Sequence, residues 1–323
     1  MSNNGKIVHK PAHWLRGFFY YLRCKIKGKP PLVNIEFTKK CNAKCGLCQY
    51  WQLDSPNELS DYSPILKVFK PVTLSISGGE PLMRKDCIEL IQGVRPHAHY
   101  ISIITNGALL NEDKARSLVR AGVDHISVSL DYLSEKHDEV RGIKDLYKHI
   151  SNTVPSLSSA GYRLSLNTII MESNLDQILP IAYKAKEWGV SVSYSAFCML
   201  KIDNDDEMVR KKRLGMLNET ISELIKLKRK LKNIRNSDFY LKKVPDYFRD
   251  GYIRNCRAGD KWIHVTPDGY IQPCSDLPRI CHYKEYNKKD LHPIACNKCW
   301  YTCRGEAEAC PFAPRRFYEL MKS

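Results

Sequence analysis

The chain has 323 residues, with 51 Lys and Arg against 35 Asp and Glu, and a formal net charge of +16 at pH 7. Hydrophobic residues make up 43% and charged residues 27%, which is typical of globular proteins and excludes disordered and collagen-like chains. No apolar stretch approaches the roughly 18 residues of a membrane-spanning helix, and the N-terminus lacks a signal-peptide hydrophobic region. We therefore expect a cytoplasmic chain with a sizeable core.

Residues 1–30 form a basic arm rich in aromatic residues. Residues 1–40 hold nine Lys or Arg and one acid, and the segment 13–23 mixes aromatic side chains with cations. Such a helix has two interpretations. It lies on an anionic membrane surface with its aromatic face buried, or it packs across the open bottom or side of the domain that follows.

Six pairs of strand and helix follow between residues 32 and 198. The expected strands cover 32–37, 72–77, 100–104, 125–130, 163–170 and 190–197. Asn111 is expected to cap a helix that stops at Gly122, and Asn174 one that stops at Gly189. The alternation predicts a parallel sheet with helices on its outer face. Six units are too few for the usual eight-stranded barrel, so we expect an α/β fold with a partial (β/α)6 TIM-like barrel over 31–200.

Several of these strands alternate polar and apolar side chains, whereas strands covered on both faces are apolar throughout. By the two-residue period of a strand, small polar residues share one face: Thr73, Ser75, Ser77, Ser127, Ser129, Asp131, Ser165, Asn167, Ser191, Ser193 and Ser195. This pattern predicts a concave inner face that holds a polar cofactor. The alternative is a half-exposed sheet whose serines face water.

The pattern changes after residue 200. Apolar residues recur at helical spacing between 205 and 235, with Lys and Arg on the other faces, which predicts a helical linker over 201–250. Two short strands then flank the turn sequence Pro267-Asp268-Gly269. They belong to a small Cys-rich α+β domain expected over 251–323.

Thirteen cysteines are unusual in a chain without an oxidising compartment. Ten of them fall into two groups, between 41 and 48 and between 256 and 310, which indicates metal sites rather than disulfides. Cys41, Cys45 and Cys48 form C-x3-C-x2-C after the first strand. Three thiolates can hold three irons of a [4Fe-4S] cluster and leave the fourth iron open. Zinc is the alternative, although zinc normally takes a fourth protein ligand and no His lies nearby.

The second expected strand ends in Gly78-Gly79-Glu80-Pro81. Two glycines let backbone approach a ligand closely, and the Glu80 carboxylate can receive an ammonium group. This turn and the cysteine loop both follow the carboxyl ends of neighbouring parallel strands, where barrel active sites lie.

Together these motifs resemble the radical S-adenosylmethionine (radical SAM) superfamily. The resemblance extends through Thr105-Asn106-Gly107, Ser129-Leu130-Asp131, His137-Asp138 and Arg141-Gly142, over about residues 32 to 198. It implies that the cluster chelates SAM, that the turn at Gly78, Gly79 and Glu80 holds the ammonium group, and that reductive cleavage gives a 5′-deoxyadenosyl radical that abstracts hydrogen from a substrate. By position, Ser129, Asp131 and Asn167 become candidate ligands of the SAM ribose and carboxylate. A reductant protein such as a flavodoxin or ferredoxin is the implied partner.

The C-terminal cysteines resemble the SPASM/Twitch extension of radical SAM enzymes, which carries auxiliary [4Fe-4S] clusters. Three residues follow Cys299 where a two-cluster SPASM domain has five, so the one-cluster Twitch form fits better. The resemblance implies one auxiliary cluster on Cys256, Cys274, Cys296 and Cys299, with Cys303 as a competing fourth ligand. Cys281 and Cys310 stay unassigned, with a second cluster as the alternative.

The resemblance does not choose the substrate. We expect oxidation or crosslinking of an anionic small molecule, a lipid or a peptide; the positive charge favours the first two, and no obvious leader-binding domain precedes the barrel. Cys198 is a candidate hydrogen donor or acceptor, against an inert buried thiol. The alternative function is a non-catalytic, zinc-stapled basic protein that binds RNA, although no recognised nucleic-acid motif accompanies its charge runs. No oligomeric state is predicted.

Overall fold

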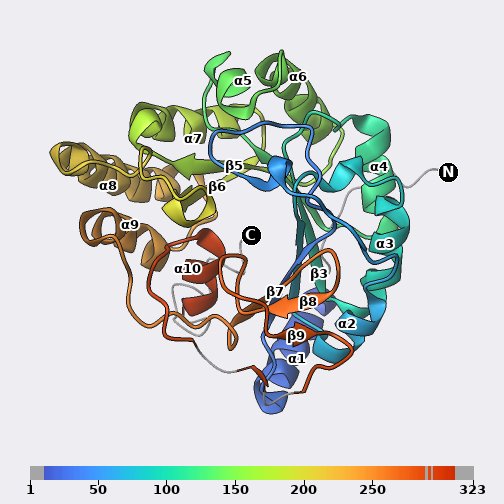
Figure 1. Ribbon diagram of the computed structural model, residues 1–323. Coiled ribbons are helices and arrows are strands. Elements are labelled where there is room, and N and C mark those ends of the chain that lie inside the picture. The colour runs from blue at the N-terminus through green and yellow to red at the C-terminus, as the bar shows by residue number, and fades with distance from the viewer. Residues whose placement is uncertain (1–10, 288–289, 292–293, 310–323) are drawn as a thin grey trace.

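Six parallel strands joined by helices form an incomplete barrel (Figure 1), in a computed structural model that describes residues 11–287, 290–291 and 294–309. Each strand pairs in parallel with the next one along the chain. The strands are β1 (Leu32–Glu36), β2 (Thr73–Ser77), β3 (Tyr100–Thr105), β4 (His125–Ser129), β5 (Leu164–Ile170) and β6 (Ser191–Ala196). The predicted partial (β/α)6 barrel is confirmed, with every strand end within one residue of its expected position.

Helices cover the outer face of this sheet (Figure 1). Outward-facing side chains such as Val33, Ile35, Leu74 and Ile76 are fully buried against them, which removes their apolar surface from water. The covering helices are α2 (Ser63–Phe69), α3 (Cys87–Val94), α4 (Glu112–Ala121), α5 (Lys136–Arg141), α6 (Leu146–Ser159) and α7 (Ile178–Glu187).

The two helix caps predicted from sequence differ in outcome. Asn111 accepts a hydrogen bond from the Lys114 amide at 2.8 Å, and Gly122 ends α4 with φ of +112°, as predicted. Asn174 does not cap α7. It lies inside a 3-10 segment, Glu172–Gln177, where its amide bonds the backbone of Met171 and Ile169. The predicted cap was wrong because the side chain of this buried Asn forms hydrogen bonds with backbone groups at the end of β5 instead of with the first turn of α7.

The sheet continues beyond β1 into the Cys-rich segment. β7 (Trp262–Val265) pairs in parallel with β1, and β8 (Tyr270–Gln272) and β9 (Cys281–His282) follow as antiparallel strands. The full strand order is β6-β5-β4-β3-β2-β1-β7-β8-β9. The predicted hairpin around Pro267-Asp268-Gly269 is confirmed as β7 and β8, and one sheet spans the barrel and the Cys-rich segment.

The C-terminal third of the chain covers both edges of the six-stranded barrel. On the β6 edge, residues 233–236 bond Val192 and Tyr194, and the Thr302 hydroxyl donates to the Tyr194 carbonyl at 2.6 Å. On the other edge lies β7. An uncovered strand edge would offer unpaired amides and carbonyls to another chain, so this coverage stabilises the open barrel. The helices here are α8 (Leu214–Leu231), α9 (Asp238–Asp250) and α10 (Thr302–Glu308).

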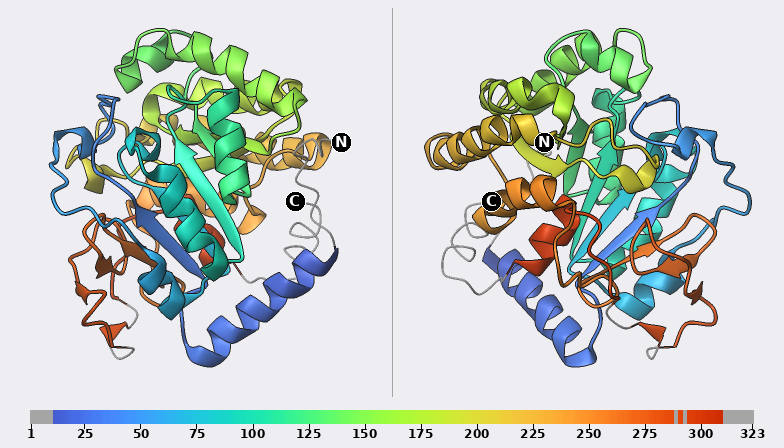
Figure 2. Two further views of the ribbon diagram at one scale, coloured as in Figure 1. Left: turned by 90° about the vertical axis from the view of Figure 1, so that its right-hand side faces the viewer. Right: turned by 60° about the vertical axis from the view of Figure 1, so that its left-hand side comes forward.

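Helix α1 (Pro11–Lys27) runs along the amino end of the barrel (Figure 2). Its Tyr20 ring lies 5.6 Å from the ring of His99, just before β3, and its Cys24 thiol donates to the carbonyl of Lys70, before β2. The packing alternative for the N-terminal arm is thus realised by one face of α1; residues 1–10 lie outside the described part of the chain. Among described residues, no helix combines the length and apolar character needed to cross a membrane.

Candidate active site and the two cysteine groups

A cavity of about 980 Å³ lies inside the incomplete barrel. Its wall contains nine residues of the predicted polar face: Thr73, Ser75, Ser77, Ser127, Ser129, Ser165, Asn167, Ser193 and Ser195. Ser191 and Asp131, expected on the same face, do not line it. The polar lumen predicted from the strand alternation is therefore present, and the alternative of serines facing bulk water is wrong for these nine.

The three cysteines of the first group also line this cavity. They lie on the loop that leaves β1, which is pinned by hydrogen bonds from the Lys44 amide to the Arg141 carbonyl (3.0 Å) and from the Gly46 amide to the Val140 carbonyl (3.3 Å). Burial raises the pKa of the Cys41 thiol to about 11. Burial also raises the pKa of Cys45, with Arg141 opposing the shift.

The two glycines after β2 allow backbone to approach backbone. A Cβ on Gly78 would lie 2.2 Å from the Thr38 carbonyl oxygen, and one on Gly79 would lie 2.2 Å from that of Lys40. Gly78 also has φ of +136°, a region that L side chains rarely adopt. The Gly79 amide donates to the Thr38 carbonyl at 2.8 Å. Both glycines line the cavity and hold the start of the cysteine loop against β2.

Glu80 is fully buried and lies behind the cavity wall. Its carboxylate accepts hydrogen bonds from the amides of Leu82 (3.1 Å) and Asn106 (2.7 Å) and from the Thr105 hydroxyl (2.8 Å). Burial raises its pKa to about 7, against these three donors, which favour the charged form. The side chain thereby joins the ends of β2 and β3.

Asp131 is likewise buried and fully engaged by protein groups. Its carboxylate accepts from Arg141 Nε at 3.0 Å and from the Ile169 amide at 2.9 Å. Arg141 also approaches the Cys45 thiol, with Nη1 4.0 Å from Sγ. Ser129 on β4 and Asn167 on β5, by contrast, line the cavity, as predicted. The predicted SAM-contacting residues thus divide into those that line the cavity and two carboxylates, Glu80 and Asp131, that brace its wall.

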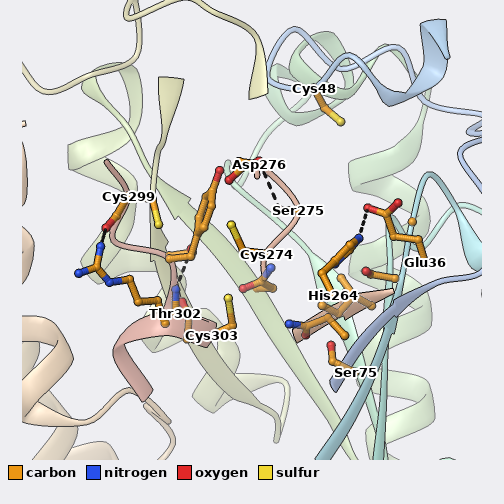
Figure 3. A pocket seen from close by; sticks show the side chains of 18 of the residues that line it. Glu36, Cys48, Ser75, His264, Cys274, Ser275, Asp276, Cys299, Thr302 and Cys303 are labelled. Atoms are coloured by element: carbon orange, nitrogen blue, oxygen red, sulfur yellow. Dashed lines mark hydrogen bonds and ion pairs between the residues drawn. The ribbon is translucent and has the colours of Figure 1, made fainter. Parts of the chain in front are cut away.

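All five predicted cysteines of the second group line the same cavity: Cys256, Cys274, Cys296, Cys299 and Cys303. Figure 3 shows Cys274, Cys299 and Cys303 across the cavity from Cys48. Burial raises the pKa of Cys256, Cys274 and Cys299. The group is assembled from three segments, one before β7, one after β8 and one leading into α10.

An arginine lies beside the second cysteine group, as Arg141 lies beside the first. Arg304 is fully buried and donates to the carbonyls of Cys299 and Ile253, both at 2.7 Å, and to Glu308 at 3.0 Å. Each cysteine group therefore has one guanidinium nearby. Such a charge stabilises thiolates and the negative charge of an iron-sulfur cluster bound to them.

The other cysteines within the described residues do not line the cavity. Cys198 is buried, and its thiol donates to the Lys298 carbonyl at 3.7 Å, under the loop that carries Cys296 and Cys299. Cys281 lies in β9 near Asp290. Cys310 lies outside the described residues.

Sequence reasoning missed a buried contact between a histidine and a carboxylate in the cavity wall. His264 Nε2 on β7 lies 3.1 Å from Glu36 Oε1 at the end of β1 (Figure 3), and Lys39 also pairs with Glu36. Burial opposes ionisation of Glu36, but His264 and Lys39 outweigh it and hold the pKa of Glu36 well below its usual range. The two-residue period of β1 places Glu36 inward; only the pairing of β1 with β7 brings His264 to it.

Three further charged residues line the cavity without having been predicted. Asp276 lies two residues after Cys274, and one of its carboxylate oxygens is buried with no hydrogen-bond partner among the residues that the structure describes. Arg235 enters from the segment after α8, and Lys298 lies between Cys296 and Cys299. Isolated charged residues in loops carry no sequence pattern, so only the fold could reveal them.

The donor sets fit iron-sulfur clusters. Each group offers at least three thiols facing one cavity, with a cation beside them. Over the described ranges, no three His, Cys, Asp or Glu side chains are gathered around a single-ion position. In a [4Fe-4S] cluster each ligating thiolate binds a different iron, so the thiols surround the cluster and do not converge on one ion position.

Comparisons with known proteins agree with this site. Residues 35–214 match the Radical SAM superfamily. "PqqA peptide cyclase" of Granulibacter bethesdensis is 24% identical over 329 residues, covering 87% of this chain and 84% of the relative. "AdoMet-dependent heme synthase" of Methanosarcina barkeri is 25% identical over 276 residues, covering 77% and 78%.

Two solved structures share the fold. Streptococcus suis SuiB bound to S-adenosylmethionine has a TM-score of 0.66 at 17% identity, covering 88% of this chain and 72% of that chain. anSMEcpe with bound AdoMet and Cp18Cys peptide has a TM-score of 0.62 at 18% identity, covering 81% and 80%. Since the superfamily match spans more than half of the sequence, including the cysteine loop and the glycine turn, the chain belongs to the radical SAM superfamily, and the enzyme prediction is confirmed over the zinc-stapled RNA-binding alternative.

Proposed function

We propose that this radical SAM enzyme acts on a substrate held in the barrel cavity, between a SAM-binding [4Fe-4S] cluster on Cys41, Cys45 and Cys48 and an auxiliary [4Fe-4S] cluster. The observation that carries the proposal is that both cysteine groups line one cavity. When bound, the first cluster supplies the electron that cleaves SAM to methionine and the 5′-deoxyadenosyl radical that abstracts hydrogen from the substrate.

The residues of this chain position SAM. The backbone at Gly78 and Gly79, together with Ser129 and Asn167, provides polar groups along the wall beside the first cysteine loop. Glu80 and Asp131 act as positioning residues in this proposal, because their carboxylates are saturated by protein donors. Nη1 of Arg141 stays beside the Cys45 thiol while its other guanidinium nitrogens bond Asp131.

The auxiliary cluster is assigned to Cys256, Cys274, Cys296 and Cys299, with Cys303 as the competing fourth ligand. All five thiols face the cavity, and Arg304 lies beside them. The barrel then corresponds to residues 31–200, the helical segment to 201–250 and the auxiliary-cluster region to 251–323. In this arrangement the cluster either accepts the substrate electron or shapes the pocket.

The charges of the cavity favour an anionic substrate group. Four cations and two carboxylates line it, namely Arg141, Arg235, Lys298, Arg304, Glu36 and Asp276. Arg141 and Arg304 are engaged beside the cysteine groups, and Glu36 is paired with His264. Arg235, which also interacts with the Tyr100 side chain, and Lys298 are the proposed ligands of carboxylate or phosphate oxygens. By their names, one relative cyclises a peptide and the other synthesises heme. These names point to no single substrate, so the anionic group alone defines the proposed class of oxidation or crosslinking substrate.

A radical SAM enzyme needs a reductant, and a flavodoxin or ferredoxin is the proposed electron donor. The proposal places the enzyme in the cytoplasm, with a peripheral membrane contact through its N-terminal helix; the surface concerned is described in the next subsection.

Iron and acid-labile sulfide per chain, measured after anaerobic reconstitution, test the cofactor assignment. About eight of each support two [4Fe-4S] clusters. About four of each with SAM cleavage retained would remove the auxiliary cluster from the proposal, and stoichiometric zinc without iron would overturn it entirely.

A further inference from the structure

Helix α1 presents a continuous apolar face to solvent. Five large side chains recur at helical spacing and are strongly exposed: Leu15 63%, Phe18 50%, Phe19 64%, Leu22 42% and Ile26 76%. The intervals of three, four and seven residues place them on one side of the helix. A contiguous exposed apolar face of this kind marks an interaction surface. We call these five residues the α1 apolar face.

The opposite side of α1 is fixed on the barrel, so the apolar face cannot turn inward. A Cβ on Gly17 would lie 2.8 Å from His99 Nε2, which shows how closely the helix approaches. Tyr20 packs on the same imidazole, and Cys24 is buried with its thiol on the Lys70 carbonyl. Rotating the helix would expose these groups and separate them from their partners.

Cations border the α1 apolar face. The helix holds Arg16, Arg23, Lys25 and Lys27 and no acidic residue, and the first Asp or Glu of the whole chain is Glu36. At about 100° per residue, Lys25 lies on one flank of the apolar face and the other three on the opposite flank. An apolar stripe between two basic borders matches the interface of an anionic bilayer, with side chains in the acyl region and cations at the headgroups.

We propose that the α1 apolar face docks the enzyme on an anionic membrane surface. A second copy is the poorer occupant, because an isologous contact through this face would oppose the same cations across the interface. At 17 residues, α1 is suited to lie in the interface plane. Its position at the amino end of the barrel (Figure 2) leaves the Cys41 to Cys48 loop, which follows the carboxyl end of β1, facing away from the bilayer and accessible to a reductant.

Vesicle flotation of the full-length holoenzyme tests this docking. We expect binding to phosphatidylcholine vesicles containing phosphatidylglycerol and little binding to phosphatidylcholine alone, with affinity falling as salt rises. Phe18→Ser/Phe19→Ser should weaken binding by about tenfold or more. Lys25→Glu/Lys27→Glu should abolish the preference for phosphatidylglycerol.

Matched surface variants distinguish docking through α1 from nonspecific adsorption to vesicles and from misfolding. Tyr183→Ser/Met216→Ser removes exposed apolar side chains on α7 and α8, and Arg229→Glu/Lys230→Glu reverses exposed charges on α8; both should bind as the native chain does. Phe18→Ser/Phe19→Ser should retain iron content and SAM cleavage in solution, so that loss of docking is distinguishable from failure of the catalytic proposal.

Several outcomes would overturn the membrane assignment. Equal flotation of the native chain with both vesicle types, or no flotation at all, would remove the anionic bilayer as occupant. Unchanged binding by Phe18→Ser/Phe19→Ser would remove α1 as the docking surface. A concentration-dependent dimer in light scattering that this variant abolishes would assign the face to a second copy instead.

Discussion

The two cysteine groups reach the same cavity by different constructions. The first lies on one eight-residue stretch, 41–48, that leaves β1 and is held by the glycine turn after β2 and by α5. The second is gathered from three segments separated by up to 47 residues, between Cys256 and Cys303. The first group is therefore a local loop placed by a barrel, whereas the second exists only when β7, β8 and α10 have all folded. An arginine accompanies each group, partly buried Arg141 for the first and fully buried Arg304 for the second, so both constructions place a cation beside the thiols.

The largest expected effect comes from the first group. Cys45→Ala should abolish 5′-deoxyadenosine formation, because the loop supplies three thiolates and no substitute cysteine lines that side of the cavity among the described residues. Product chromatography after incubation with SAM and reductant measures this. Cys87→Ala, which removes a buried thiol on α3 outside the cavity wall, serves as the control. Continued turnover by Cys45→Ala would contradict the assignment of Cys41, Cys45 and Cys48 as ligands of the SAM-binding cluster.

Disrupting the second cysteine group should remove the auxiliary cluster and leave the first cluster in place. Cys274→Ala should lower iron from about eight to about four per chain while SAM cleavage persists, because the first loop is built independently. Iron and sulfide analysis checks this, with Cys281→Ala, on β9, as the matched control that keeps its iron. An unchanged iron content in Cys274→Ala would show that this thiol is not a ligand.

The arginine beside the first group should matter for stability as well. Arg141→Met leaves the fully buried Asp131 without its cation, and we expect the free energy of unfolding to fall by about 4 kcal/mol. Denaturant titration followed by circular dichroism measures the loss. Asp131→Asn/Arg141→Met should recover part of it, while Arg116→Met, in an exposed pair with Glu112, should change nothing measurable. Equal stability of Arg141→Met and the native chain would contradict the buried pairing.

A smaller, pH-dependent effect is expected from Glu80, which braces the glycine turn. Burial raises its pKa from 4.5 to about 7, so between these values the folded chain retains a proton that the unfolded chain releases. The contribution of Glu80 to stability is present below pH 4.5 and is lost as pH rises through 7, by about 3 kcal/mol. Unfolding at a series of pH values should show this fall in the native chain relative to Glu80→Gln. Parallel curves for the two proteins would exclude it.

The contiguous motifs were predictable because the residues that carry the chemistry, and the spacing that sets their geometry, lie within a few positions of one another in the sequence. The cysteine loop, the glycine turn, the six strands and the inner face of Thr73 or Ser193 each follow from local spacing and a period of two. The strand pattern alone, however, cannot tell a polar side chain that faces a cavity from one that faces a buried partner. Asp131 shares its strand period with Ser129 but meets Arg141 and the Ile169 amide instead.

Pairings across long sequence separations were beyond the sequence pattern. The parallel contact of β1 with β7 joins residues about 230 positions apart, and it alone brings His264 to Glu36. The segment 201–250, expected as a linker, also supplies Arg235 to the cavity and bonds the backbone of β6. Such contacts depend on which strand edges remain open after the barrel forms. A short stretch of sequence does not contain that information.

The coverage of both barrel edges makes the protein difficult to dissect. A chain shortened to residues 1–250 would keep the first cysteine loop and every barrel strand, yet β1 would lose the ladder it shares with β7. Its bare backbone would then template association with other chains, so we expect such a fragment to aggregate during expression. Modular exchange of the Cys-rich segment among relatives would meet the same obstacle, because the donor segment must supply a strand in register with β1 as well as the cysteines.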